Sequence, residues 1–193
     1  LVLGAGSILQ NFWWAIVLVT TLVVVQFRLM LADTEKRFAW DDRVLGMRWV
    51  GDLVGKIEIA RLSRTLGTLL TNGVPLLGAL SIARNVLSNT VLRKDVNDAA
   101  REVKTGGGLA HNLAKGGRFP RLALQMISVG EETGQLDSML MKVSDTYDLE
   151  VRNTIDRLLS IFTPVVTLLL AVLIGTIVLS VLVAILSIND LVG

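Results

Sequence analysis

Two long apolar segments lie on either side of a polar middle region. Residues 1–27 carry no charge, and residues 158–189 form a second uncharged run. A bilayer core about 30 Å thick is crossed by roughly 20 residues of α-helix, so each segment is long enough to span a membrane. The pattern predicts an integral membrane protein with transmembrane helices in 1–31 and 158–188 and a short tail at 189–193.

The basic residues predict which way the protein sits in its membrane. All 19 Lys and Arg residues fall from Arg28 to Arg157, between the two apolar segments. Cations close to the ends of spans stay in the cytoplasm. We therefore expect the middle region in the cytosol and both ends of the chain on the far side. The first span has no basic residues before it, so it does not resemble a cleavable signal peptide. The chain starts at Leu1 and not at Met, which indicates a piece of a longer polypeptide.

The middle region reads as helical. A linker is expected at 32–55, followed by a helical-bundle domain at 56–157. In this domain apolar residues recur every three or four positions, and Gly and Pro separate the repeats. Ser88 or Asn89 is suited to cap one of the helices. The pattern predicts an all-α fold with six cytosolic helices, at 56–70, 75–87, 89–104, 109–114, 121–132 and from 135 onward.

The sixth helix has no breaker before Pro164 and therefore runs into the second span. Its apolar positions continue from Gln135 to Leu158, which favours one continuous helix from the cytosolic bundle into the membrane. Pro164 is expected to kink it at membrane entry. The alternative is a break near Arg152 and Asn153, which would leave the two parts independent.

Small residues occupy every fourth position of the second span. A row of small side chains lets two helix backbones approach closely in lipid. The row therefore predicts a packing face, although such residues are also common in membrane spans. Its members are Thr163, Thr167, Ala171 and Gly175.

Composition and motifs give no support for catalysis, a cofactor or a metal. The chain has no Cys and a single histidine, His111, so a zinc site lacks ligands. The glycines at 106–108 and 116–117 lack the Gly-Lys-Ser/Thr order of a phosphate-binding loop and read as helix-to-helix turns. The charge is nearly balanced, with 19 basic against 17 acidic residues, which argues against nucleic-acid binding.

Two carboxylates are placed against the helix dipole. Glu131 and Glu132 fall in the last turn of the helix expected at 121–132, where negative charge is unfavourable by about 0.3–1 kcal/mol. Such acids can be retained for a contact with a basic partner or a neighbouring Arg. The alternative is that Glu132 is only solvated and that Gly130 lets two helices touch.

Two motifs resemble the type II secretion system F family, which includes the platform proteins of type IV pilus assembly. The first is the run 61–80, with Leu69, Leu70, Gly73, Pro75 and Leu80. The second is Gly130-Glu131-Glu132-Thr133-Gly134-Gln135-Leu136-Asp137, followed by Met139 and Leu140 and preceded by Phe119 and Pro120. Tyr147, ahead of the final span, also fits.

The resemblance implies a non-enzymatic, polytopic protein of the bacterial inner membrane with two copies of the six-helix domain and three spans. This chain resembles the second copy with its flanking spans. The resemblance also implies partners: a cytosolic hexameric secretion ATPase, other inner-membrane platform subunits and pilin-like subunits, in an oligomeric assembly surrounded by lipid. The residues that we expect to contact a partner are Gly130, Glu131, Glu132, Gly134 and Leu136.

The chain departs from the family pattern at two places. Thr163 stands where many members have Glu before the membrane-entry Pro, which puts a role for that acid in doubt. Residues 186–190 lack an apolar-Pro ending, which favours secretion over the pilus branch. A permease subunit with a regulatory cytosolic domain and a membrane-tethered enzyme are the other readings. A permease needs polar residues or broken spans along its path, and an enzyme needs a catalytic constellation.

Overall fold

The computed structural model describes residues 18, 21, 22 and 34–192, with side chains as far as residue 182. From residue 34 onward these form seven α-helices and one 3-10 turn, and no strand. The elements are α2 (Thr34–Gly46), α3 (Val50–Thr71), α4 (Leu76–Ala83), η1 (Arg84–Val86), α5 (Thr90–Lys104), α6 (Leu109–Lys115), α7 (Arg121–Thr133) and α8 (Leu136–Val192). The all-α prediction is confirmed for the described residues.

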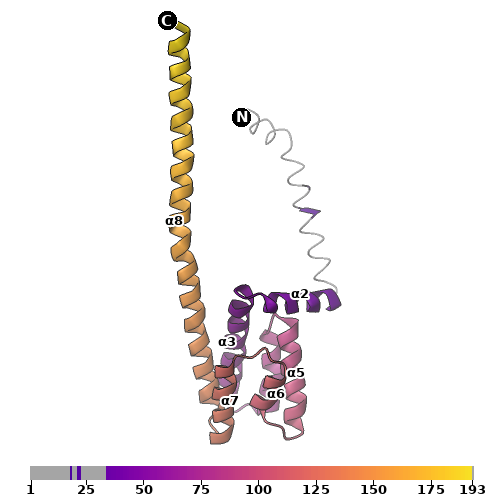
Figure 1. Ribbon diagram of the computed structural model, residues 1–193. Helices are drawn as coiled ribbons and strands as arrows, with labels where there is room; N and C mark the ends of the chain where they lie inside the picture. Colours follow the sequence, from indigo (N-terminus) through magenta and orange to yellow (C-terminus); the bar gives the residue numbers. More distant parts are fainter. Residues whose placement is uncertain (1–17, 19–20, 23–33, 193) are drawn as a thin grey trace. The chain divides into compact units, whose positions relative to one another are not determined.

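The chain divides into two units, Leu1–Tyr147 and Asp148–Gly193. In the first unit α3, α5, α6, α7 and the start of α8 stand side by side, and α2 lies across one end of the bundle (Figure 1). Their inward side chains form one apolar core. Its largest fully buried members are Ile59, Leu66, Leu80, Leu87, Val91, Leu92, Val96, Leu109, Leu113, Leu140 and Val143.

Helix α2 is absent from the six helices that the sequence predicts, and it corrects the expected linker at 32–55. The structure forms α2 at Thr34–Gly46 and starts α3 at Val50. The six predicted helices are all present, so the bundle has one helix more than expected. The sequence of α2 is mostly polar, and its contacts with the bundle include polar bonds between distant residues, such as Asp41 with Thr90.

The turn from α2 to α3 depends on Gly51. A Cβ atom on this residue would lie 2.2 Å from the carbonyl oxygen of Leu45, which belongs to the backbone. The amide of Gly51 also donates to the carbonyl oxygen of Met47 at 2.8 Å. The two helices can therefore meet at this corner only without a side chain at position 51.

Proline stands directly before two of the helices. Pro75 has φ −58° and ψ 144°, and its carbonyl oxygen accepts from the Ala79 amide at 2.9 Å. The structure thus places Pro75 at the N-cap of α4, one residue before the helical position that the sequence predicts. Pro120 has the same conformation before α7. Each proline has no N–H of its own and has its φ fixed near the value that leads into a helix.

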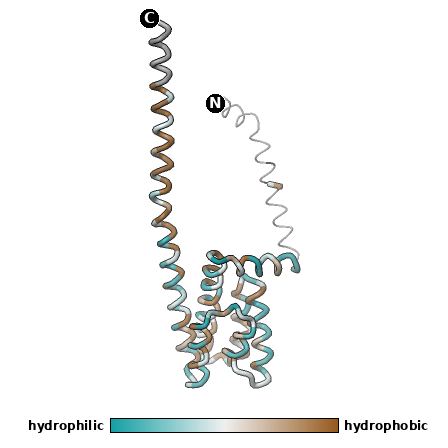
Figure 2. The backbone as a smooth tube through the Cα atoms, in the orientation of Figure 1, coloured by the Kyte–Doolittle hydropathy of each residue, from teal (hydrophilic) through white to brown (hydrophobic). Residues whose placement is uncertain are grey.

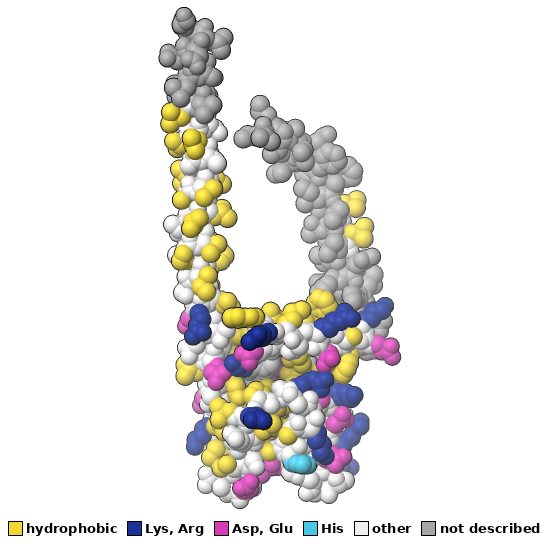
Figure 3. Space-filling view, in the orientation of Figure 1, with side chains coloured by type: hydrophobic (Ala, Val, Ile, Leu, Met, Phe, Trp, Pro, Cys, Tyr) yellow, Lys and Arg dark blue, Asp and Glu magenta, His cyan; other side chains and the backbone are white. Residues whose placement is uncertain are grey.

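Helix α8 extends without a break over 57 residues and passes through Pro164. This confirms the predicted continuity; the kink expected at Pro164 stays a prediction. Among the described residues, α8 is the one helix long and apolar enough to cross a membrane, and its most apolar stretch has no buried residue. A core helix of a soluble protein would be largely covered. Figure 2 shows the high hydropathy of the residues along this part of α8, and Figure 3 shows their apolar side chains.

The first predicted span, 1–31, lies outside the described residues except for Leu18, Thr21 and Leu22. The prediction of two transmembrane helices is therefore supported by one described helix, α8, and by the apolar sequence of residues 1–27.

Substituting Gly51 tests the α2–α3 corner. We expect Gly51→Ala to lower the free energy of unfolding by about 1–3 kcal/mol, because the added methyl group overlaps the backbone of Leu45. Gly46→Ala is the matched control, since a Cβ atom there meets nothing within 4 Å. Thermal unfolding of the two variants in detergent measures the difference. Equal stability would show that the corner does not depend on Gly51.

Candidate functional site

The carboxylate of Glu131 lies at the N-terminus of helix α6. Its Oε1 atom accepts a hydrogen bond from the Leu109 amide, and its Oε2 atom accepts from the Ala110 amide at 2.9 Å. The first amides of a helix have no partner within it, and a negative charge there is stabilised by the helix dipole. Glu131 therefore caps α6 from the neighbouring helix α7. This contact accounts for an acid in the last turn of α7 without requiring a partner protein.

Gly130 and Gly134 complete the joint between α7 and α8. A Cβ atom on Gly130 would lie 2.9 Å from both Leu136 Cα and Met139 Cβ, so the two helices touch at this residue. Gly134 has φ +69°, a conformation that side chains disfavour. The amide of Gln135 donates to the Gly130 carbonyl oxygen at 2.9 Å, and Gly134 donates to that of Glu131 at 3.4 Å. This pair of bonds is a Schellman motif.

The other two members of the predicted partner site differ in exposure. Leu136, the first residue of α8, is half-buried and packs against the core. Glu132 is exposed, and its Oε1 atom accepts from the Ser128 hydroxyl at 3.1 Å within α7. The structure therefore brings Gly130, Glu131, Gly134 and Leu136 into one packed joint, with Glu132 on its outside. Partner binding by these residues stays a prediction.

The first motif ends α3 with the same Schellman arrangement of hydrogen bonds. Gly73 has φ +78°, its amide donates to the Leu70 carbonyl oxygen, and the Val74 amide donates to that of Leu69, both at 2.9 Å. Leu80 is fully buried in the core, and Leu69 and Leu70 pack against it. The motif residues therefore serve to stop α3 and turn the chain into α4.

Helix α3 also approaches the start of α8 closely, at Gly67. A Cβ atom there would lie 3.0 Å from Met141 Cγ and 3.1 Å from the Asp137 carbonyl oxygen. Arg64, one turn earlier, bonds to Asp145 at 3.0 Å. Both motif regions thus border the first three turns of α8.

The N-terminus of α5 is a second polar joint, which the sequence analysis misses in part. Asn89 caps the helix as predicted, accepting from the amides of Val91 and Leu92 at 3.0 and 3.1 Å. The buried carboxylate of Glu58 on α3 accepts from the Ser88 amide at 2.7 Å. Asp41 accepts from Thr90. Glu58 and Asp41 lie 30 and 49 residues from their partners, so no local pattern could reveal them.

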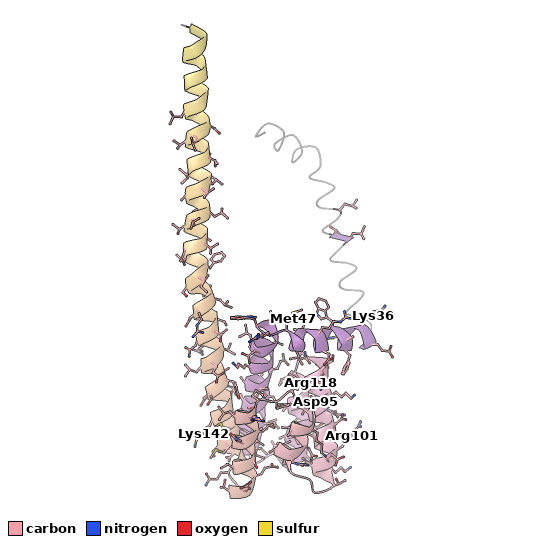
Figure 4. All side chains as sticks on the ribbon, in the orientation of Figure 1. Lys36, Met47, Asp95, Arg101, Arg118 and Lys142 are labelled. Carbon is pink, nitrogen blue, oxygen red and sulfur yellow. The ribbon has the colours of Figure 1, made fainter. Side chains whose placement is uncertain are left out.

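A third polar cluster joins α2, α5 and the loop before α7. Arg118 bonds to Asp42 at 2.9 Å and to Asp95 at 3.4 Å. Figure 4 shows Arg118 and Asp95 close together on neighbouring elements. Burial raises the pKa of Asp95, and the charge of Arg118 partly opposes this rise. The hydrogen bond to Asp42 raises the pKa of Arg118. The cluster therefore consists of ion pairs that hold elements together.

The described residues contain no group of three or more His, Asp or Glu side chains placed to hold a metal. His111 is exposed on α6. A cleft of about 410 Å³ lies against α5 and α6 and is lined by charges of both signs, among them Lys94, Asp98, Glu102 and Lys115. Such a mixed lining favours ion pairing within the domain over binding of one charged ligand.

The small residues of the second span lie on α8 with a spacing of four, so they share one helix face. The Thr167 hydroxyl donates to the Thr163 carbonyl oxygen at 2.9 Å, and a Cβ atom on Gly175 would meet nothing. The hydroxyl of Thr167 is thus satisfied within the helix. Packing through Thr163, Thr167, Ala171 and Gly175 stays a prediction.

Residues 62–184 match the family described as Type II secretion system (T2SS), protein F. The chain belongs to this family. The resemblance inferred from the two motifs is therefore confirmed, and both motifs fall largely within the matched residues.

Named relatives come from secretion and from pilus assembly. Type II secretion system protein F of Xanthomonas campestris pv. campestris is 46% identical over 192 residues, which cover 100% of this chain and 47% of that protein. Its counterpart in Pseudomonas aeruginosa is 35% identical, with 94% of this chain and 45% of that protein covered. Type IV pilus assembly protein PilC of Pseudomonas aeruginosa is 31% identical, with coverages of 100% and 52%. The chain spans about half the length of these relatives.

Substituting Glu131 and Glu132 one at a time distinguishes the contribution of the cap from that of the exposed acid beside it. We expect Glu131→Ala to lower the free energy of unfolding by about 0.5–2 kcal/mol, because the first amides of α6 lose their acceptor. Glu132→Ala removes an equal charge from the same helix turn and should change stability by less than about 0.5 kcal/mol. Thermal unfolding in detergent compares them. Equal effects of the two variants would contradict the cap.

Proposed function

We propose that this chain is part of an inner-membrane platform subunit of a type II secretion system, which couples a cytosolic secretion ATPase to pseudopilus assembly and protein export. Membership of the protein F family and the 46% identical relative from secretion support this function. The role is mechanical and non-enzymatic. It requires that a folded cytosolic domain transmit movement to a membrane segment.

The proposed topology has a cytosolic bundle between two spans of the bacterial inner membrane. The spans are 1–31 and 158–188, and both ends of the chain, including 189–193, lie in the periplasm. The confinement of every Lys and Arg to the stretch from Arg28 to Arg157 supports this orientation. Since α2 contacts α3 and α5, we take the cytosolic domain as 34–157 in place of the earlier boundary at 56.

The continuity of α8 is the observation that carries the proposal. Near its start, Leu140, Val143 and Tyr147 are buried in the core of the first unit. The same helix continues to Val192 and includes the apolar stretch that could cross a membrane. An unbroken helix resists bending, because a sharp bend breaks the backbone hydrogen bonds of the helix at that place. A displacement of the bundle end of α8 is therefore expected to displace the membrane end of the same helix.

The partners that we propose follow from the family. They are a cytosolic hexameric ATPase, other inner-membrane platform subunits and pilin-like subunits. The small-residue row of α8 is the proposed contact face within the membrane, and the subunit functions as an oligomer. The absence of charge from 158–189 leaves lipid as the other neighbour of this helix.

A platform role in type IV pilus assembly is the second candidate, favoured by the 31% identity to PilC across the whole chain. Expression of the full-length protein in strains that lack either the secretion or the pilus platform separates the two. Restored export without restored pili supports secretion, and the reverse result supports the pilus.

Breaking α8 between its two parts tests the coupling. We expect Asn153→Pro to abolish export of a reporter enzyme, because Pro removes a backbone hydrogen bond and bends the helix at a cost of about 3 kcal/mol. Asn153→Ala keeps the helix and should export at the parental level. Both proteins should reach the membrane in equal amounts. Full export by the Asn153→Pro variant would contradict transmission through α8.

The exposed acid of the second motif tests the partner site without disturbing the cap. We expect Glu132→Lys to reduce co-purification with the secretion ATPase several-fold, since the charge is reversed on the surface while Glu131 stays in place. Gln125→Lys, which adds a cation at another exposed position of α7, is the control. Unchanged co-purification of the Glu132→Lys variant would remove this acid from the contact.

A further inference from the structure

Four cations surround the connection between α4 and α5 and are held by neutral groups. The Arg37 guanidinium donates to the Ser88 carbonyl oxygen at 3.3 Å, and Arg93 Nε donates to that of Leu87 at 3.2 Å. Each guanidinium has five N–H donors, so most of them are left for other acceptors.

The other two cations also contact neutral groups. Arg84 donates to the side-chain oxygen of Asn97, and the Lys94 ammonium lies 5.5 Å from the centre of the Phe38 ring. In the part of the chain that the structure describes, none of the four forms an ion pair with a carboxylate. The one carboxylate bonded to this connection from α2, Asp41, accepts from Thr90. A second carboxylate, that of Glu58 on α3, accepts from the Ser88 amide. The three guanidinium groups are thus held by hydrogen bonds to neutral oxygens, and none of the four cations is paired directly with an acid among the described residues.

Three of these cations line a cleft of about 350 Å³. Its lining residues are Arg84, Asn85, Thr90, Arg93, Lys94 and Asn97, so it contains no acid and no aromatic ring. Fixed guanidinium groups bind carboxylates and phosphates with paired, directional hydrogen bonds. The lack of a ring on which a base could stack disfavours a nucleotide. The cleft thus suits an anion of simple shape.

Two exposed aliphatic side chains lie on α4, before this cleft in the sequence. Leu77 is 42% exposed and Ile82 is 50% exposed, and Ile82 lies one turn before Asn85 of the cleft. Exposed aliphatic side chains beside Arg are typical of the centre of a protein–protein interface. Helices that lie on membranes commonly present Trp or Phe as well as Leu opposite their cations, and no Trp or Phe lines this cleft. The combination favours a protein segment over a lipid headgroup or free phosphate.

We propose that the cleft and the outer face of α4 bind an acidic amphipathic segment of a cytosolic partner protein. Carboxylates of the segment occupy the cleft between Arg84, Arg93 and Lys94, and its apolar side chains pack on Leu77 and Ile82. This surface deepens the proposed function, on which it rests for the cytosolic location of the domain. It lies on α4 and α5, separate from the motif at 130–136.

Site-specific crosslinking in cells tests the proposal. A photo-crosslinking amino acid replaces Asn85 in the full-length protein, and the captured segment is identified by mass spectrometry. We expect a segment rich in Asp and Glu. The double variant Arg84→Glu with Lys94→Glu should lower the yield by about 10-fold or more. Arg121→Glu with Lys142→Glu makes the same charge change at exposed positions on α7 and α8 and should leave the yield unchanged.

Reciprocal substitutions make the test specific. Lys in place of the acids of the captured segment should restore crosslinking to the Glu double variant. Arg84→Gln with Lys94→Gln, which removes charge but keeps hydrogen-bonding side chains, should also lose the crosslink while unfolding at the parental temperature. Recovery of phospholipid, capture of a segment without acids, or an unchanged yield in the Glu double variant would overturn the proposal.

Export measured in the same cells separates this surface from the proposed function. Normal export by the parent with no protein captured from position 85 would overturn the surface and leave the function standing. Failure of the parental chain to restore export or pili would instead contradict the function, whatever position 85 captures.

Discussion

The contact of Glu131 with the first amides of α6 holds together the joint from which α8 starts. Glu131 ties α7 to α6, and directly beside it Gly130 lets α7 touch Leu136 and Met139 of α8. A larger residue at 130 would separate the helices, and loss of the carboxylate would leave amides of α6 without a partner. The position of the start of α8, and any movement passed along it, therefore depends on a few residues of one motif.

Polar bonds at helix ends position the other elements of the bundle. Glu58 and Asp41 come from different helices to meet the start of α5, and Arg118 connects Asp42 to Asp95. Helix α2 is thus held by specific acceptors as well as by the packing of Leu45 against the core. These bonds attach α2 to the bundle near the point where the described part of the chain begins, at Thr34.

The sequence predicts the helices whose ends carry strong backbone signals and misses contacts between distant residues. Gly73 and Gly134 mark helix ends because glycine adopts a positive φ without steric cost, and Pro75 marks a helix start because its ring fixes φ. Six helices therefore follow from the sequence. Helix α2 is missed because its apolar pattern is weak and its polar bonds join residues far apart. The same holds for Glu131. Its position against the dipole of α7 is visible in the sequence, but its acceptor role at α6 appears only when the two helices pack.

Coupling through α8 requires that the helix stay unbroken between the bundle and the apolar stretch. A distance measured across residues 147 and 148, where the two units meet in sequence, tests this requirement directly. The chain has no Cys, so spin labels at Lys142→Cys and Asp156→Cys are specific. The two positions are exposed and share a helix face. An unbroken helix gives a single narrow distance between the labelled backbone positions of about 21 Å in nanodiscs. A broad or clearly shorter distribution would show that α8 bends between its two parts.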